Sequence, residues 1–146
     1  MAIFDAEPLV AVLLGEPGGL VSGPMLADKP AAHAICALNA AEVVNIVARR
    51  SASSPRSVID RFEGWIEAGL RVVPLGWDRA RRAAELRSVH YHRTQCAVSL
   101  ADCGAIALAE QREAELVTSD PAMLKVARAE GVAVLPVPDS SGRTPK

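Results

Sequence analysis

Glu115-Leu-Val-Thr-Ser-Asp-Pro121 is the stretch of the chain that points most directly to a class of fold. Its first four residues, Glu115–Thr118, form a short run flanked by turn residues, which is typical of a strand buried on both faces of a sheet. Ser119-Asp120-Pro121 then places a capping residue before a proline, and this predicts a helix that begins at Pro121. A buried strand that leads directly into a helix indicates a parallel sheet covered by helices.

The rest of the chain repeats this alternation. Four further short apolar runs are predicted to be strands: Met1–Phe4, Ala34–Leu38, Leu70–Pro74 and Val132–Leu135. Helical patterns fill the intervals, at Glu7–Leu14, Leu20–Ala27, Asn39–Arg49, Pro55–Glu67, Trp77–His92, Ser99–Glu113 and Pro121–Glu130. We therefore predict an α/β protein, a three-layer α/β/α sandwich with a central, mainly parallel five-stranded sheet.

The composition indicates one folded domain. The chain has 146 residues, of which 50% are hydrophobic and 23% are charged, and these values exclude global disorder. We expect a single domain over residues 1–138 and a polar tail over residues 139–146. The net charge of −1 lacks the basic excess of many nucleic-acid-binding domains, although it allows a local basic surface.

Three features bear on the compartment and on metal or disulfide chemistry. No apolar run reaches the ~20 residues of a membrane span, and the first residues lack the basic region of a secretory signal. The three cysteines, Cys36, Cys96 and Cys103, include no CxxC pair, which argues against a zinc site or a disulfide framework. We expect a cytoplasmic protein without a membrane segment.

Carboxylates stand at the ends of predicted strands. Asp5 closes the first apolar run and Asp120 follows the fourth. Ligands of open α/β sheets bind at the carboxyl ends of the strands, so these two acids converge if the first and fourth strands are neighbours. Two simpler interpretations remain open, since Asp120 is also a good helix cap and Asp5 is also an ordinary turn residue.

Two more acids stand near predicted helix starts. Asp102 shares a helix side with Ala105, Ile106 and Ala109, the small apolar side, where a buried carboxylate needs a partner or a metal. The alternative is an acid favoured by the helix dipole. Glu42 is the only acid in its predicted helix, and an exposed first-turn Glu explains it equally well on its own. Together the four carboxylates suggest a site for Mg²⁺ or Mn²⁺, which prefer oxygen ligands.

Four motifs in this order resemble those of the PIN-domain ribonucleases, and within them the VapC-type toxins of type II toxin–antitoxin pairs. The motifs are Phe4-Asp5-Ala6 with the later Gly15-Glu16-Pro17 turn, Asn39-Ala-Ala-Glu42, Ser99-Leu-Ala-Asp102-Cys103 and Leu116-Val-Thr-Ser-Asp120. One departure is Glu7, which stands where the family usually has a small polar residue.

The resemblance implies the PIN fold and a Mg²⁺- or Mn²⁺-dependent endoribonuclease that acts as a toxin. It implies that the catalytic, metal-holding residues are Asp5, Glu42, Asp102 and Asp120, supported by Thr118 and Ser119. It also implies an RNA substrate, a small cognate antitoxin and a homodimer, for which the apolar segments near Leu9–Leu14 and Ile46 are candidate surfaces.

RNA binding also requires positive charge. Arg87, Arg82 and Arg93 belong to an arginine-rich helix and its end, and we expect them to contact phosphates, although a solvated face explains them too.

Two other functions remain open: a Mg²⁺-dependent phosphoester hydrolase of another kind, and a non-catalytic binding module with the same fold. The first usually carries Asp-x-Asp after the first strand, where this chain has Asp5-Ala-Glu7, and the second usually lacks some of the acids.

Overall fold

The computed structural model describes residues 1–146 and places five strands in one sheet. The strands are β1 (Ala2–Phe4), β2 (His33–Cys36), β3 (Arg71–Val73), β4 (Glu115–Thr118) and β5 (Val134–Pro136). They lie in the order β3-β2-β1-β4-β5, and every neighbouring pair is parallel. The predicted class and the five-stranded sheet are confirmed, and the sheet is parallel throughout.

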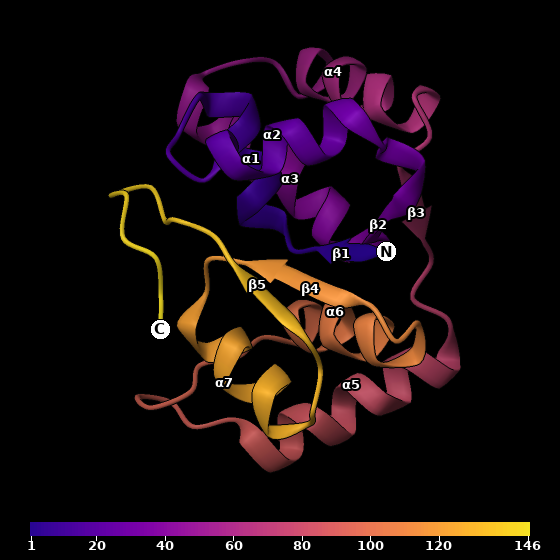
Figure 1. Cartoon of the computed structure of the whole chain (residues 1–146), viewed down its shortest axis with the longest axis vertical. Coiled ribbons are helices and arrows are strands. Elements are labelled where there is room, and N and C mark those ends of the chain that lie inside the picture. The colour runs from indigo at the N-terminus through magenta and orange to yellow at the C-terminus, as the bar shows by residue number, and fades with distance from the viewer.

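Helices cover both faces of the sheet and form three layers with it (Figure 1). One layer holds α1 (Ala6–Leu14), α2 (Gly19–Asp28), α3 (Ala37–Ser51) and α4 (Pro55–Glu67). The other holds α5 (Trp77–His90), α6 (Leu100–Gln111) and α7 (Pro121–Ala129). A short 3₁₀ turn, Pro30–Ala32, leads into β2. The predicted α/β/α sandwich is confirmed.

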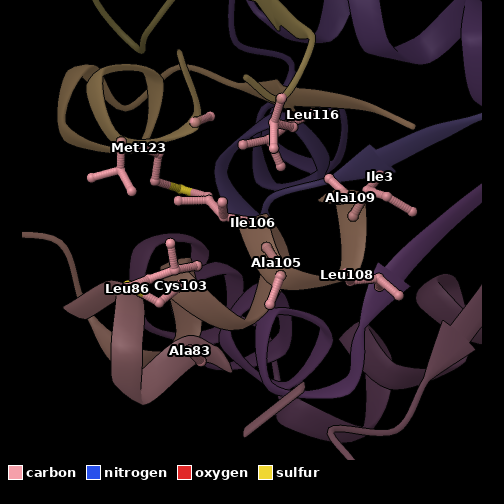
Figure 2. Packing of buried hydrophobic residues seen from close by; sticks show 14 of the residues in the cluster. Ile3, Ala83, Leu86, Cys103, Ala105, Ile106, Leu108, Ala109, Leu116 and Met123 are labelled. Atoms are coloured by element: carbon pink, nitrogen blue, oxygen red, sulfur yellow. The ribbon is translucent and has the colours of Figure 1, made fainter. Parts of the chain in front are cut away.

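Side chains of successive strand residues enter different cores because they point to opposite faces of the sheet. Phe4 packs in a cluster of 15 buried residues beneath α1 and α3, whereas Ile3 packs in a cluster of 19 on the other face. Figure 2 shows this second cluster, in which Ile106 of α6 lies between the sheet and α5. α6 is the most deeply buried helix, with every residue from Cys103 to Ala109 buried.

Several predicted boundaries are wrong by one or two residues. The last strand was predicted at Val132–Leu135 and is found at Val134–Pro136, because the Val132 N–H donates to the Ala127 carbonyl (2.8 Å) in the turn that ends α7. Leu38 lies in α3 and not in a strand. The helix predicted to reach His92 ends at His90, since His92 pairs with Cys96 in an isolated bridge.

The strand order places a switch point beside β1. The chain leaves β1 toward β2 and β3 on one side, and later places β4 and β5 on the other side. The carboxyl ends of β1 and β4 are therefore adjacent, and the Asp5 N–H donates to the Val117 carbonyl at 3.0 Å. Crevices at such points are where open α/β sheets bind ligands.

The segment after β5 is held by local hydrogen bonds. The segment after β5 contains no helix or strand, and Asp139 accepts hydrogen bonds there from the Ser141 and Arg143 backbone N–H groups (2.8 and 3.0 Å).

No single helix is long and apolar enough to cross a membrane. Only α1 and α2 taken together have the length and composition of a membrane span, and the two helices are bent by 95° to each other.

Candidate active site

Four predicted acids lie at the carboxyl edge of the sheet. Asp5 follows β1 and caps α1, and Asp120 follows β4 and caps α7. Asp102 lies in the first turn of α6 and Glu42 in the second turn of α3. Their charges act on one another, since Asp102 and Asp120 both raise the pKa of Asp5, and Asp102 raises that of Glu42. The structure thus brings together the four acids that the sequence singled out.

Asp5 is the buried centre of this group, with only 3% of its surface exposed. Its carboxylate accepts hydrogen bonds from the Ala6 N–H (2.6 Å), the Asn39 side-chain amide (3.2 Å) and the Thr118 hydroxyl (2.8 Å). Burial raises the pKa of Asp5 to about 7, helped by repulsion from Asp102 and opposed by the bonds from Thr118 and Ala6. A nearby cation would therefore favour the charged form of Asp5 near neutral pH.

Asp102 combines a local role with a place in the acidic group. Its carboxylate accepts from the Ser99 N–H at 2.7 Å, while the Ser99 hydroxyl accepts from the Asp102 N–H at 3.1 Å, which forms a capping box. Such a box stabilises a helix start. Burial and the charge of Asp120 nevertheless raise the pKa of Asp102. Asp102 therefore lies in the first helical turn, as the helix-dipole interpretation expects, and is also partly buried near Asp120.

Thr118 connects the two acids that follow β1 and β4. Its hydroxyl donates to Asp5 and accepts from the Asp120 N–H at 3.0 Å, and the side chain is completely buried. Asp120 in turn accepts from the N–H groups of Ala122 (2.6 Å) and Met123 (3.4 Å) at the start of α7. Ser119 is only half-buried, and no side-chain hydrogen bond holds it.

Glu42 and Glu7 lie on the outer side of Asp5, Asp102 and Asp120, and we call these five carboxylates the acidic edge. Glu42 is partly buried, and its pKa is raised by burial, by Asp102 and by Glu7. Glu7 lies 3.6 Å from the Arg50 guanidinium, but burial and the charges of Glu16 and Asp120 still raise its pKa. Glu7, the residue that departs from the family motif, therefore adds a fifth carboxylate, which interacts electrostatically with Asp120 and Glu42.

Asn39 contacts the central acid of the site, although the sequence indicated only that it begins a helix and the Asn39-Ala-Ala-Glu42 motif. It is fully buried; its amide N–H donates to Asp5, and its amide oxygen Oδ1 is buried without a hydrogen-bond partner. The sequence did contain a signal, because Asn39 precedes Glu42 by three residues and so lies on the same helix side.

The chemistry of these residues fits a hydrated Mg²⁺ or Mn²⁺. Every donor at the edge is an oxygen, and the buried, unpartnered Oδ1 of Asn39 is a further one. No three carboxylates form a ready-made coordination shell. Mg²⁺ does not require one, because it usually keeps several waters and binds through one or two carboxylates.

The predicted RNA-contacting arginines are dispersed. Arg82 pairs with Glu110 (2.8 Å) and Glu130 (2.7 Å), near the ends of α6 and α7 that are remote from Asp102 and Asp120. Arg87 donates to the Val98 carbonyl (3.2 Å) and lies 4.2 Å from the centre of the Tyr91 ring.

The third predicted arginine, Arg93, is exposed on the segment between α5 and α6. None of the three forms an ion pair with the four acids.

Solved structures with a similar fold cover most of the chain. VapC20 of Mycobacterium tuberculosis, a sarcin–ricin loop cleaving toxin, is 16% identical with a TM-score of 0.71 over 91% of this chain and 97% of its own. A toxin–antitoxin complex from Klebsiella pneumoniae is 21% identical with a TM-score of 0.58, over 82% of this chain and 87% of its own.

A third similar structure is VapBC2 of Rickettsia felis bound to a fragment of promoter DNA. It is 18% identical with a TM-score of 0.56, over 92% of this chain and 98% of its own. At these identities the likeness establishes the fold alone, and the sequence matches no curated protein. The PIN domain family, however, matches residues 2–129, and the chain therefore belongs to the PIN domain family.

Proposed function

We propose that this protein is a Mg²⁺- or Mn²⁺-dependent endoribonuclease and the toxin of a toxin–antitoxin pair. The observation that carries the proposal is the buried Asp5 at the switch point of the sheet, with carboxylates from α3, α6 and α7 close enough to raise pKa values within the group. The similar folds support it, because they belong to an RNA-cleaving toxin and to toxin–antitoxin complexes. A cytoplasmic location is part of the proposal.

The acids Asp5, Glu42, Asp102 and Asp120 would hold the cation, directly or through water. When bound, the cation supplies an activated water and neutralises charge that develops on the phosphodiester during in-line hydrolysis. Thr118 fixes the orientation of Asp5 and holds the backbone N–H of Asp120 through its one hydroxyl. This arrangement keeps two acids in place before the substrate arrives, which is the contribution a rigid scaffold makes to catalysis.

Two protein partners complete the proposal: a small antitoxin that covers the acidic edge, and a second copy of the chain. Within the predicted dimer segment Leu9–Leu14, Leu9 and Val10 are buried in the protomer's own core, so Val12, Leu13 and Leu14, which are only partly buried, are its candidates for the dimer surface. Ile46 is half-buried against the same core. Light scattering at micromolar concentration distinguishes a dimer from a monomer, and a monodisperse monomer contradicts the dimer.

Cleavage of a mixed RNA pool tests the function. Wild-type protein is expected to cut RNA in millimolar Mg²⁺ or Mn²⁺ and not in EDTA. Asp5→Asn and Asp102→Asn are expected to reduce the rate by orders of magnitude, because a neutral amide binds Mg²⁺ much more weakly than the carboxylate it replaces. Asp60→Asn is the matched control, since Asp60 is exposed and pairs only with Arg56 on α4. Full turnover by both active-site variants contradicts the assignment, and binding of RNA without any cleavage supports a non-catalytic module.

A further inference from the structure

A basic depression lies beside the acidic edge. It encloses about 510 Å³ and is lined by Gln95, Pro121, Ala122, Lys125, Arg128 and Lys146. Three of these residues carry basic side chains and none carries an acidic side chain. This balance is unusual in a chain whose net charge is −1 and which holds only three lysines. Two of the three lysines therefore line a single depression.

The cations of the depression have no partners within the protein. Lys125 and Arg128 are exposed and lie three positions apart, so they project from the same side of α7. Neither they nor Lys146 takes part in an ion pair. By contrast, Arg82 pairs with three glutamates and Arg50 with two. The free cations of the depression are thus available to an external anion.

The walls of the depression are attached to the candidate active site. One wall begins at Pro121, the residue directly after Asp120, and its neighbour Ala122 donates a hydrogen bond to the Asp120 carboxylate (2.6 Å). Gln95, from the segment before α6, also lines the depression, and its N–H donates to the ring of His92 at 3.2 Å. The Cys96 thiol contacts the Ala122 carbonyl at 3.9 Å and so connects this segment to the start of α7.

We propose that this depression binds phosphates of the RNA backbone on one side of the bond that is cut. The inference rests on the proposed ribonuclease function, because it describes where that substrate continues beyond the acids. A helix rises 1.5 Å per residue, so Lys125 lies about 6 Å and Arg128 about 10 Å along α7 from its start. For a strand stacked as in a double helix, with roughly 3.4 Å of rise per nucleotide, these spans correspond to about two to three nucleotides.

The depression offers charge contacts to phosphates, and such contacts do not distinguish one base from another. Lysine binds phosphate as a point charge and arginine binds it with a planar fork, and neither contact depends on the base. No aromatic ring lines the depression, so stacked bases have no platform there. The site therefore contributes affinity and register to RNA of any sequence.

The first experiment measures binding without turnover. The probe is a fluorescent 12-nucleotide oligouridylate in EDTA, titrated between 50 and 200 mM salt by anisotropy. Each backbone charge contact on a single strand contributes about −0.7 to the slope of log affinity against log salt. Lys125→Gln with Arg128→Gln is therefore expected to make the slope shallower by about 1.4.

The matched control is Lys29→Gln with Arg112→Gln. Lys29 follows α2 and Arg112 follows α6, both are exposed without ion pairs, and both precede strands, at the opposite edge of the sheet. This double variant makes the same change in net charge and is expected to keep the wild-type slope. An equal fall in slope for both double variants, or no fall for either, overturns the proposal. Thermal melting confirms that all variants are folded.

The second experiment uses cleavage in Mg²⁺. The Lys125/Arg128 double variant is expected to raise KM for a 12-nucleotide RNA about tenfold, with a smaller loss on a dinucleotide, which is too short to reach Arg128. An equal loss on both lengths overturns the proposal. The two proposals fail in different ways. If the depression does not bind phosphates, wild-type protein still cuts RNA and the double variant leaves the binding slope unchanged. If the protein is not a ribonuclease, neither wild type nor any variant cuts RNA, whatever the binding slope shows.

Discussion

At the scale of single residues, Asp5 shows how the fold accommodates a charge that would otherwise be costly. A buried ionised carboxylate is stabilised only by hydrogen bonds or by a cation. Asp5 has three hydrogen bonds, from Ala6, Asn39 and Thr118, and those from Thr118 and Ala6 lower its pKa less than burial and repulsion raise it. The remaining imbalance is what a bound cation would remove.

Asp102 allows this imbalance to be tested by thermal melting. In EDTA, Asp102→Asn is expected to melt at a higher temperature than wild type, because one repelling charge is gone while the amide oxygen still accepts from the Ser99 N–H. A cation that binds only the folded state stabilises by about 2.7 kcal/mol at a hundredfold excess over its Kd. Wild type is therefore expected to gain several degrees in millimolar Mg²⁺, and Asp102→Asn to gain much less.

Asp78→Asn provides the matched control for that experiment. Asp78 is an exposed acid in the first turn of α5, so its charge interacts with the helix dipole and not with the acidic group. Its variant is expected to melt slightly lower in EDTA and to show the full wild-type response to Mg²⁺. Equal responses in Asp102→Asn and wild type contradict a cation site that includes Asp102.

At the scale of elements, the start of α7 combines helix capping with the acidic edge. The Asp120 carboxylate accepts from two N–H groups of the first turn, as any good cap does. Asp120→Ala is expected to destabilise the fold by about 1 kcal/mol. Asp120→Ser keeps a capping oxygen and is expected to change stability by only a few tenths of that, and both variants are expected to lose RNA cleavage. Urea unfolding and cleavage rates measure the two effects separately.

Ser54→Ala controls for the loss of a cap. Ser54 caps α4 by accepting from the Ser57 N–H at 3.2 Å, on a helix that carries none of the four acids. Its loss is expected to reduce stability by a similar amount while cleavage stays at the wild-type rate. Wild-type cleavage by Asp120→Ser means that Asp120 acts only as a cap.

At the scale of the whole molecule, the acidic edge governs how stability depends on pH. The pKa values of Asp5, Glu7, Glu42 and Asp102 are all raised in the folded state. A carboxyl group whose pKa is raised on folding stabilises the folded state fully at pH values below its unfolded-state pKa, near 4. This contribution is lost as the pH rises through the folded-state pKa. For Asp5 that window extends from about 4 to about 7. The metal-free protein is therefore expected to melt at a lower temperature at pH 8 than at pH 5.

Other titrating groups do not reverse this trend. The pKa values of Glu130 and Asp139 are lowered by hydrogen bonds, so their contributions change only below pH 5. His33 acts in the opposite direction, because partial burial lowers its pKa, but it is one group against four. Melting scans in EDTA at pH 5 and pH 8 measure the difference, and Asp5→Asn is expected to reduce it. A wild-type melting temperature that rises between pH 5 and pH 8 contradicts the acidic edge as described.

The amino-acid sequence by itself determined the parts of this protein that depend on residues close in the chain. The strand and cap at Glu115–Pro121, the helix start at Asp102 and the five strands all follow from local hydrogen bonds and hydrophobic periodicity. The order of the four acids along the chain is also enough to indicate the family. The strand boundaries were the weakest part, as the shift of β5 shows, because turns depend on backbone geometry that periodicity does not describe.

Only the tertiary structure decided which distant residues meet. Asn39 contacts Asp5 across 34 residues, and Arg82 is held by Glu110 and Glu130 and so is unavailable to the acidic edge. Lys125 and Lys146 line one depression although 21 positions separate them. These tertiary contacts depend on the strand order and on which face of the sheet each helix covers. A pattern within one segment holds no information about either, because the packing of that segment is chosen by the free energy of the whole chain.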